Sequence, residues 1–308
     1  MYPKISIIIV NMNGKNMLEE CLTSLLSLTE YSSYNIIVVD NGSTDGSVEM
    51  VKDKFPNVEI IPLNRNYGFT KANNIGIRYA FQKFDPDYIL LLNNDTKIIQ
   101  KNWLKKMVDS RYDLVQPIIL NKDGTVQSKG GGILILGIPY LIKGDEKPLW
   151  ISFASALISR EVFDKIGLLN EDYVIYSEDL EFCLRAKAHN FSVGVANTEI
   201  IHYGNSTIIR LSRKRQIFHY YKTRNDYWTI TRYYRSKLMK AGYIAFSIFQ
   251  SLTLLLRKNI EGSKSVIMGL FQALLNPCQN FYSFPTPNTS LFKLLIIFKS
   301  WLENSIRY

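Results

Sequence analysis

The first 110 residues alternate between short apolar runs and segments whose apolar residues have helical spacing. Apolar strands that alternate with helices are typical of a mainly parallel, Rossmann-like sheet flanked by helices. The predicted strands are Ile5 to Val10, Asn35 to Asp40, Val58 to Leu63 and Tyr88 to Leu92, and the predicted helices are Asn16 to Leu28, Asp45 to Lys54 and Thr70 to Phe84. The pattern therefore predicts an α/β fold whose ligand lies beyond the carboxyl ends of the strands.

Polar side chains follow each predicted strand at the point where it ends. They are Asn11 and Asn13 after the first strand, Asp40 to Asp45 after the second, Asn64 to Phe69 after the third, and Asn93 to Asp95 after the fourth. Asp95 is a candidate metal ligand, although a helix cap or a turn is the commoner role of such a residue. The sequence has neither a Gly-x-Gly-x-x-Gly after the first strand nor a Walker-type Gly-Lys-Ser/Thr, which argues against a dinucleotide or P-loop site.

These strand ends contain the candidates for contacts with a base or a sugar. Asp40 can accept a hydrogen bond from a base, while the residues after it turn the chain into the next helix. The remaining candidates are the amides Asn66 and Asn73 and two glycines, Gly68 for close approach of a backbone and Gly76 for close helix packing.

Charge and cysteine content restrict the partners and the compartment. The 37 Lys+Arg against 27 Asp+Glu give a net charge of +10, which favours an anionic partner. Length suggests about two domains. The three cysteines have no metal-type spacing and argue against a disulfide framework. Because the apolar run from Lys4 to Val10 is too short for a signal-peptide core, we expect a cytoplasmic protein.

A second group of carboxylates lies at Glu178 and Asp179. Apolar residues that follow at helical spacing predict a helix in which both acids occupy the first turn, where free N–H groups favour the ionised form. A charged Asp at a crevice can act as a general base, but acids in a first turn are also ordinary dipole partners. Glu181 is predicted to be a solvated helix residue that pairs with Arg185.

Two further side chains have both a structural and a functional interpretation. His202 follows a strand-like segment and is either an ordinary loop residue or a metal ligand. Trp150 either stacks on a sugar or closes the core.

The last third of the chain is basic, aromatic and apolar. From Arg210 to Lys240 there are ten Lys or Arg against the single acid Asp226, with aromatic residues between them. No nucleic-acid motif accompanies this stretch, so we expect a membrane surface, a diphosphate or a solvated helix face rather than nucleic acid. Three apolar segments, 243–256, 266–275 and 291–302, are predicted to be too short to span a bilayer. Residues 236–308 are predicted to form a helical tail that binds the membrane surface, with a helical domain or a homodimer contact as the alternative.

Taken in order, six segments resemble the inverting family 2 glycosyltransferases of GT-A fold, and most of all the rhamnosyltransferase-type members that build bacterial surface polysaccharides. The segments are Ile5 to Asn13, Asp40 to Asp45, Asn66 to Phe69, Asn73 to Gly76, Leu92 to Thr96 and Tyr176 to Asp179. The resemblance covers about residues 4 to 235 and implies a domain over 1–235. Its nucleotide-sugar half would be 1–110, and its acceptor half would be 111–235.

The resemblance also implies a role for each site residue. Asp40 would contact the base and Asn94 the ribose, while Asp95 would bind Mn²⁺ or Mg²⁺ with His202 completing the metal site. Asp179 would be the catalytic base, and Glu178 would help to position the acceptor, with Trp150 on the acceptor side. Because Asn93 and Asn94 stand where an Asp-x-Asp motif carries more charge, we expect a modest metal affinity that depends on the diphosphate for further ligands.

The expected function is metal-dependent, inverting transfer of a sugar from a dTDP- or UDP-sugar to a glycan or lipid-linked glycan acceptor. The expected location is peripheral, at the inner face of the cell membrane. One alternative is a sugar nucleotidyltransferase, which is disfavoured because the segment from Asn11 to Lys15 contains only one Gly. The other is a non-catalytic, membrane-associated assembly factor for polysaccharide enzymes.

Overall fold

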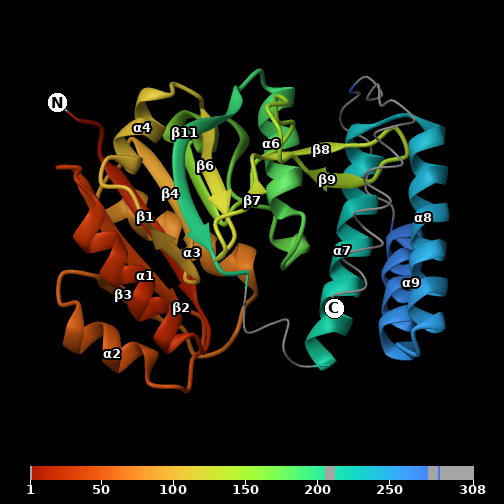
Figure 1. Ribbon diagram of the computed structural model, residues 1–308, viewed down its shortest axis with the longest axis horizontal. Helices are drawn as coiled ribbons and strands as arrows, with labels where there is room; N and C mark the ends of the chain where they lie inside the picture. The colour runs from red at the N-terminus through yellow and green to blue at the C-terminus, as the bar shows by residue number, and fades with distance from the viewer. Residues whose placement is uncertain (1, 205–211, 277–283, 285–308) are drawn as a thin grey trace. The chain divides into compact units, whose positions relative to one another are not determined.

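The computed structural model describes residues 2–204, 212–276 and 284 (Figure 1). The chain divides into two compact units. Met1–Gly130 and Ile142–Arg215 form the first unit, and Gly131–Leu141 and Gln216–Tyr308 form the second. The first unit contains the large sheet, and the second contains the long helices that follow it in the chain.

The sheet of the first unit has a parallel half and a mixed half. Its strands are β1 (Ile5–Asn11), β2 (Tyr34–Asp40), β3 (Glu59–Pro62), β4 (Tyr88–Asn93), β5 (Thr96–Ile98), β6 (Leu114–Leu120), β7 (Val126–Ser128), β10 (Ser155–Ser159) and β11 (Val193–His202). Over the described residues their order is β3-β2-β1-β4-β10-β6-β11-β5, and β7 pairs with β6. The first four strands are parallel, whereas β10 is antiparallel to both of its neighbours and β5 is antiparallel to β11.

Helices lie between many of these strands. They are α1 (Lys15–Leu28), α2 (Ser47–Lys54), α3 (Phe69–Lys83), α4 (Trp103–Asp109), α5 (Arg160–Ile166), the short 3-10 helix η1 (Glu171–Tyr173) and α6 (Glu178–Ala188). The sequence predicts α1, α2, α3 and α6 of these helices. The predicted α/β class is confirmed, and the first three helices begin and end within two residues of the predicted positions.

The parallel half is apolar on both faces, as expected for strands that helices cover from both sides. Ile7, Ile8 and Ile9 in β1 and Leu90 and Leu91 in β4 are fully buried. The helix α3 approaches this layer at Gly76. A Cβ atom at Gly76 would lie 2.7 Å from Ile8 Cγ2 and 3.0 Å from Val39 Cγ2, so the predicted close packing at Gly76 is confirmed.

The second unit combines a two-stranded sheet with helices. Its elements are β8 (Gly131–Ile133), β9 (Pro139–Leu141), α7 (Ser212–Tyr233), α8 (Lys237–Leu256) and α9 (Ile260–Leu275). The helices α8 and α9 form a hairpin (Figure 1). The Ser251 and Ser263 hydroxyls of the two helices lie 2.7 Å apart. The predicted third apolar segment, 291–302, lies outside the described residues.

The first apolar tail segment belongs to a longer helix than predicted. Ser236 caps α8 by accepting a hydrogen bond from the Met239 N–H at 3.2 Å, so the helix begins at Lys237 and has 20 residues. By length and composition α8 is long enough to cross a membrane, and no other helix in the described ranges meets this test. The prediction that the segment is too short to span a bilayer is therefore wrong.

Part of the basic, aromatic stretch is internal to the second unit. Arg224 is 8% exposed, and its guanidinium lies 4.2 Å from the centre of the Trp228 ring and 4.8 Å from that of Tyr221. Asp226 is buried and forms an ion pair with Lys222 at 2.6 Å. A solvated helix face therefore accounts for only part of the positive charge in this stretch.

Candidate active site

The carboxyl ends of β1 and β4 mark the point at which the strand order reverses. From β1 the chain continues through β2 and β3 on one side, and then returns through α3 to β4 on the other side. Open α/β sheets bind their ligands at such a switch point. The register places Asn11 beside Asp40 and Val10 beside Asn93, so the polar ends of three strands meet at one edge.

Asp40 joins the loops at this edge of the sheet through hydrogen bonds. The carboxylate is 1% exposed, and its Oδ1 accepts from the Ser43 N–H at 2.8 Å while its Oδ2 accepts from Asn11 Nδ2 at 3.0 Å. The Asn11 Oδ1 in turn accepts from Asn94 Nδ2 at 2.7 Å. Since a carboxylate has about four acceptor sites, Asp40 keeps capacity for a ligand. The structure thus brings together three of the predicted nucleotide-sugar residues, and the contact of Asp40 with a base stays a prediction.

Asn13 and Ser43 join the loops that follow β1 and β2. Asn13 has a φ of 49°, and its Oδ1 accepts from the Thr44 N–H at 2.8 Å. The Ser43 hydroxyl oxygen accepts from the Asn13 N–H at 2.8 Å and from Asn11 Nδ2 at 3.2 Å. Sequence reasoning did not assign this bridging role to Ser43.

Asn41 was also missed, because the sequence presented it as a turn residue. It is 3% exposed and holds the loop after β3, with Nδ2 donating to Asn66 Oδ1 at 2.9 Å and to the Gly68 carbonyl at 3.1 Å. Its Oδ1 accepts from the Tyr67 N–H at 2.9 Å. Through Asn41, the predicted residues Asn66 and Gly68 are attached to the end of β2. The available signal was its position directly after Asp40.

Two predicted residues are buried elsewhere in the first unit. Asn73 is 2% exposed, and its Nδ2 donates to the Phe69 carbonyl of its own helix at 2.9 Å. Trp150 is 8% exposed, which favours the core-closing interpretation of the two that its sequence position allowed. Sugar contacts of either residue stay predictions.

Asp95 and His202 face each other because β5 pairs with β11. Thr96 lies opposite His202 in this ladder, and the Tyr203 N–H donates to the Asp95 carbonyl at 2.9 Å. The His202 Nε2 lies 3.1 Å from Asp95 Oδ1. The structure therefore brings together the two residues that were predicted to hold a metal ion.

The pair fits a divalent cation. Asp95 is 1% exposed, and its Oδ2 is buried with no hydrogen-bond partner among the described residues. An unpartnered buried carboxylate oxygen is costly, and a nearby cation removes that cost. Within residues 2–204, 212–276 and 284, no group of three His, Cys, Asp or Glu is placed to hold a metal. Two protein ligands suit Mn²⁺ or Mg²⁺ when a diphosphate and water supply the others.

Asp179 lies in the first turn of α6, after a segment with unusual backbone geometry. Val174, Tyr176 and Ser177 all have positive φ angles, of 57°, 69° and 63°. Val174 is the centre of a γ-turn in which the Ile175 N–H donates to the Tyr173 carbonyl at 2.5 Å. A γ-turn with positive φ is rare and strained, and such strain persists only where surrounding contacts impose it.

The first of these contacts comes from α3. The Val174 carbonyl accepts from the Phe69 N–H at 2.8 Å and from the Thr70 N–H at 3.2 Å, two groups that have no partner within the helix. Gly68 leaves the room for this approach, since a Cβ there would lie 2.8 Å from Val174 Cγ1. The strained turn before Asp179 is thus bound to the end of the loop that Asn41 holds.

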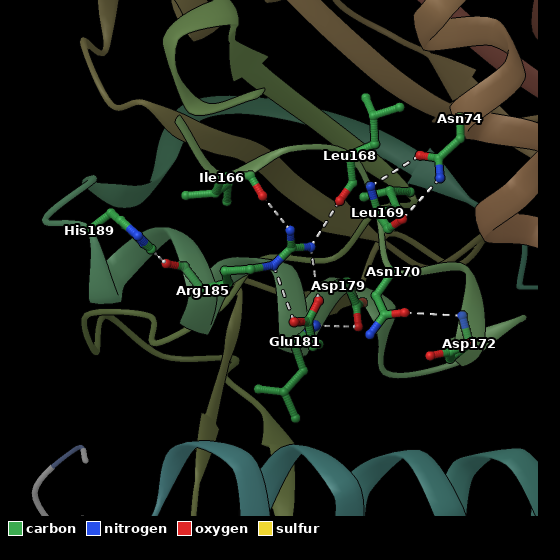
Figure 2. A network of polar contacts seen from close by, with 11 residues as sticks. Asn74, Ile166, Leu168, Leu169, Asn170, Asp172, Asp179, Glu181, Arg185 and His189 are labelled. Atoms are coloured by element: carbon green, nitrogen blue, oxygen red, sulfur yellow. Dashed lines mark hydrogen bonds and ion pairs between the residues drawn. The ribbon is translucent and has the colours of Figure 1, made fainter. Parts of the chain in front are cut away.

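The second contact comes from α6 itself, as Figure 2 shows. Arg185 donates to both carboxylate oxygens of Glu181, at 3.2 and 3.1 Å, and to the carbonyls of Ile166 at 2.6 Å and Leu168 at 3.0 Å. The predicted pairing of Glu181 with Arg185 is confirmed. The prediction that Glu181 is solvated is wrong, because this face of α6 lies against residues 166–169 and Glu181 is 1% exposed.

The third contact is Asn74 of α3, which lies across from Leu169 in Figure 2. Its Nδ2 donates to the Leu169 carbonyl at 2.9 Å, and its Oδ1 accepts from the Leu169 N–H at 3.1 Å. Asn74 also donates to Glu171 Oε1 at 3.1 Å. Between them, Arg185, Asn74 and the start of α3 hold the segment that precedes Asp179 at several points.

Glu178 is nearly buried next to Asp179, with 8% of its surface exposed. Burial raises the pKa of the neighbouring Tyr176 phenol, and the Glu178 charge raises it further. Tyr176 therefore stays protonated near neutral pH. The role of Glu178 toward an acceptor stays a prediction.

Comparison with known proteins places this geometry in a family. A sequence profile described as Glycosyl transferase family 2 matches residues 6–167. The low-salt glycan biosynthesis hexosyltransferase Agl10 of Haloferax volcanii is 26% identical over 294 residues, which are 90% of this chain and 92% of that protein. The dTDP-rhamnosyl transferase RfbF of Shigella flexneri is 25% identical over 273 residues, which are 82% and 90% of the two chains.

Two solved structures have the same fold. GalNAc-T7 with UDP, GalNAc and Mn²⁺ has a TM-score of 0.63 at 14% identity, covering 94% of this chain and 59% of that one. The mannosyltransferase PcManGT of Pyrobaculum calidifontis, in complex with GDP-Man and Mn²⁺, has a TM-score of 0.56 at 13% identity, covering 98% and 80%. The predicted GT-A fold is confirmed.

Proposed function

This chain belongs to glycosyl transferase family 2, and from that premise we propose that it transfers a hexosyl or rhamnosyl group from a dTDP- or UDP-sugar to a glycan or lipid-linked glycan. We further propose that the reaction requires a divalent cation and inverts the anomeric carbon. The names of two relatives, a hexosyltransferase of glycan biosynthesis and a dTDP-rhamnosyl transferase, support this class of donor and acceptor.

The observation that carries the metal requirement is the Asp95 carboxylate. One of its oxygens lies 3.1 Å from His202 Nε2, and the other is buried without a partner among the described residues. Asp95 lies just beyond β4, one of the strands at which the sheet order reverses and where a nucleotide diphosphate is expected, and the pairing of β5 with β11 brings His202 beside it. Asp95 and His202 would hold Mn²⁺ or Mg²⁺. When bound, the cation would act as a Lewis acid and neutralise the negative charge of the departing diphosphate.

In the proposed reaction, the acceptor hydroxyl oxygen bonds to the anomeric carbon while the bond from that carbon to the diphosphate oxygen breaks. Asp179 takes the proton of the hydroxyl as general base. Its place in the first turn of α6 favours the ionised carboxylate that this role needs. The bonds of Val174, Leu169 and Arg185 support a fixed position for this residue before the acceptor arrives.

We also propose that the tail attaches the enzyme to the cytoplasmic face of the membrane, where a lipid-linked acceptor would lie. Apolar side chains remain exposed along the α8 and α9 hairpin, and among them are Leu252, Leu256, Met268, Phe271 and Leu275. Apolar helices flanked by basic residues suit an interface with anionic lipid. Co-sedimentation with anionic vesicles measures this attachment, and a concentration-dependent dimer without vesicle binding would contradict it.

The central experiment is a donor panel. Purified protein is incubated with dTDP- and UDP-sugars in Mn²⁺, in Mg²⁺ and in EDTA, and both binding and turnover are measured. For Asp179→Asn we expect the turnover of the preferred donor to fall by roughly 10²–10⁴, the usual contribution of a general base, with donor affinity unchanged. The anomeric configuration of the product, read by NMR, is expected to be inverted.

Asp172→Asn is the matched control, because Asp172 is an exposed carboxylate of the same segment. It is expected to turn over like the parent protein. Full turnover by Asp179→Asn would overturn the assignment of the base, and turnover in EDTA would overturn the metal requirement. If no donor binds under any condition, the assembly-factor alternative replaces the enzyme.

A further inference from the structure

The His202 ring is held from its far side by Gln127. The His202 Nδ1 lies 2.8 Å from Gln127 Oε1, while Nε2 lies on the Asp95 side of the ring. Strand pairing creates this contact, since Leu120 of β6 pairs both with Ile201 of β11 and with Val126 of β7. Gln127 lies between Val126 and Ser128, where the register of the β6–β7 pair shifts, and so stands beside the strand that carries His202.

A chain of hydrogen bonds fixes which atom of Gln127 faces the ring. A carboxylate can only accept, so the Thr125 hydroxyl donates to Asp123 Oδ1 at 2.6 Å and accepts from Asn121 Nδ2 at 2.9 Å. The Asn121 Oδ1 is then left to accept from Gln127 Nε2 at 3.0 Å. The same Gln127 nitrogen lies 3.4 Å from the His202 carbonyl, which also can only accept.

The donor-to-acceptor direction of these hydrogen bonds determines which nitrogen of the His202 imidazole carries the proton. With Gln127 Nε2 committed to two acceptors, Oε1 is the atom available to His202, and an oxygen can only accept from Nδ1–H. In a neutral ring with a proton on Nδ1, the other nitrogen carries a lone pair. That lone pair then lies beside Asp95 Oδ1, 3.1 Å away.

We propose that Gln127, oriented by Asn121 and Thr125, is a positioning residue that keeps neutral His202 in the Nδ1–H tautomer and so keeps its Nε2 available to a cation. The inference rests on the metal role proposed for His202. The opposite tautomer would let Nε2–H donate to Asp95 Oδ1, and the two side chains would then satisfy each other instead of a metal. Partners of metal-binding histidines generally act in this way.

Two substitutions separate this role from simple packing. Gln127→Leu removes the acceptor with little change in size, whereas Gln127→Glu keeps an oxygen in its place. For Gln127→Leu we expect the Nε2–H tautomer and an affinity for Mn²⁺ that is about 10–100-fold weaker, the usual effect of losing such a partner. Gln127→Glu is expected to retain the Nδ1–H tautomer and to bind Mn²⁺ at least as tightly as the parent protein.

The tautomer is read directly by ¹⁵N NMR of metal-free protein with labelled histidine, at a pH where the rings are neutral. The chain has three histidines, and His189 provides an internal reference, because its Nδ1 faces the Arg185 carbonyl of α6 at 2.9 Å. His202 is identified by loss of its signal in His202→Asn. Binding of Mn²⁺ alone, and of Mn²⁺ with UDP, is followed by electron paramagnetic resonance.

An Nε2–H tautomer in the parent protein would overturn the proposal, as would a Gln127→Leu variant with an unchanged His202 signal. Loss of Mn²⁺ affinity in both variants would also overturn it, since the glutamate retains the acceptor. If His202 has the Nδ1–H tautomer but Mn²⁺ fails to bind even with UDP, the positioning role of Gln127 stands and the metal-dependent function proposed above fails. The NMR readout thus distinguishes the two failures.

Discussion

Asp95 and Asp179 are both carboxylates with a proposed chemical role, yet the chain holds them by different means. Asp95 lies between two strands, directly before β5, and the pairing of β5 with β11 determines where it lies. Asp179 follows a loop with three positive φ angles, whose shape depends on bonds from Asn74, Arg185 and the start of α3. The sheet positions the first carboxylate, and contacts of the preceding loop with α3 and α6 position the second.

The two carboxylates also differ in whether the surrounding structure stabilises their negative charge. Asp95 keeps one buried oxygen without a partner among the described residues, so the metal-free protein bears the cost of that charge. Asp179 lies at the amino terminus of a helix and accepts from the Leu180 N–H at 2.8 Å, an environment that stabilises a negative charge. In this comparison the proposed metal ligand is held with an unfavourable buried charge, and the proposed base with a favourable one.

The largest expected effect is that of Asp95→Asn, which tests the contrast between the two carboxylates. We expect kcat/KM in Mn²⁺ to fall by on the order of 10³, because Lewis-acid stabilisation is worth several kcal/mol. The free energy of unfolding of the metal-free variant should be equal to or above that of the parent protein, since an amide replaces a buried charge. Steady-state kinetics and urea unfolding measure the two quantities.

Asp179→Asn is the counterpart in this test. Its metal-free unfolding free energy is expected to drop by about 0.3–1 kcal/mol, the usual value of an acid in a first helical turn. If Asp95→Asn destabilised the metal-free protein more than Asp179→Asn does, the contrast between the two sites would be lost.

A smaller effect is expected when the support of the loop is removed. Arg185→Met removes the ion pair of Arg185 with the buried Glu181 carboxylate and frees the carbonyls of Ile166 and Leu168. Removing one partner of a buried ion pair lowers the free energy of unfolding by about 3 kcal/mol, which urea unfolding should reveal. The double variant Arg185→Met with Glu181→Met should recover much of this loss, because no unpaired charge remains.

A double variant as unstable as Arg185→Met would mean that the two backbone carbonyls, and not the charge, dominate the effect. A single variant within 0.5 kcal/mol of the parent protein, the range of ordinary surface substitutions, would show that the loop does not need Arg185.

A smaller effect than that of Arg185→Met is expected at the contact between α3 and the γ-turn. Gly68 has φ 86° and ψ 172°, a conformation that is essentially restricted to glycine, and its missing Cβ makes room for Val174. Gly68→Ala should therefore destabilise the protein by about 2 kcal/mol. Thermal and urea unfolding measure the change, and turnover should fall with it because the turn leads to Asp179.

Gly124→Ala is the matched control, since Gly124 has φ 82° and nothing within 4 Å of the position of a Cβ. It should cost about 1 kcal/mol from backbone strain alone. Equal effects of the two substitutions would show that the approach of Val174 to Gly68 contributes nothing.

The same contrast explains what the sequence can predict. Strand ends and the register of a parallel sheet follow from periodicity, so Asn11, Asp40, Asn94 and Asp95 could be expected at one edge before the fold was known. The burial of Glu181 could not, because it depends on a loop that packs against α6 from more than ten residues earlier in the chain. Asn41, Asn74 and Gln127 were missed for the same reason, since a polar residue in a turn, a helix or a short strand gives no local sign of a distant partner.

The pairing of β5 with β11 has a consequence for synthesis of the chain. Asn93 and His202 are 109 residues apart, yet their side chains meet at the same edge. Contacts between residues so distant in sequence form only after a large loop has closed. A nascent chain that ends before β11 contains Asp95 but not the histidine that faces it. Binding of a cation by the proposed metal pair would therefore require both halves of the first unit to have assembled, and metal affinity would then report completed folding.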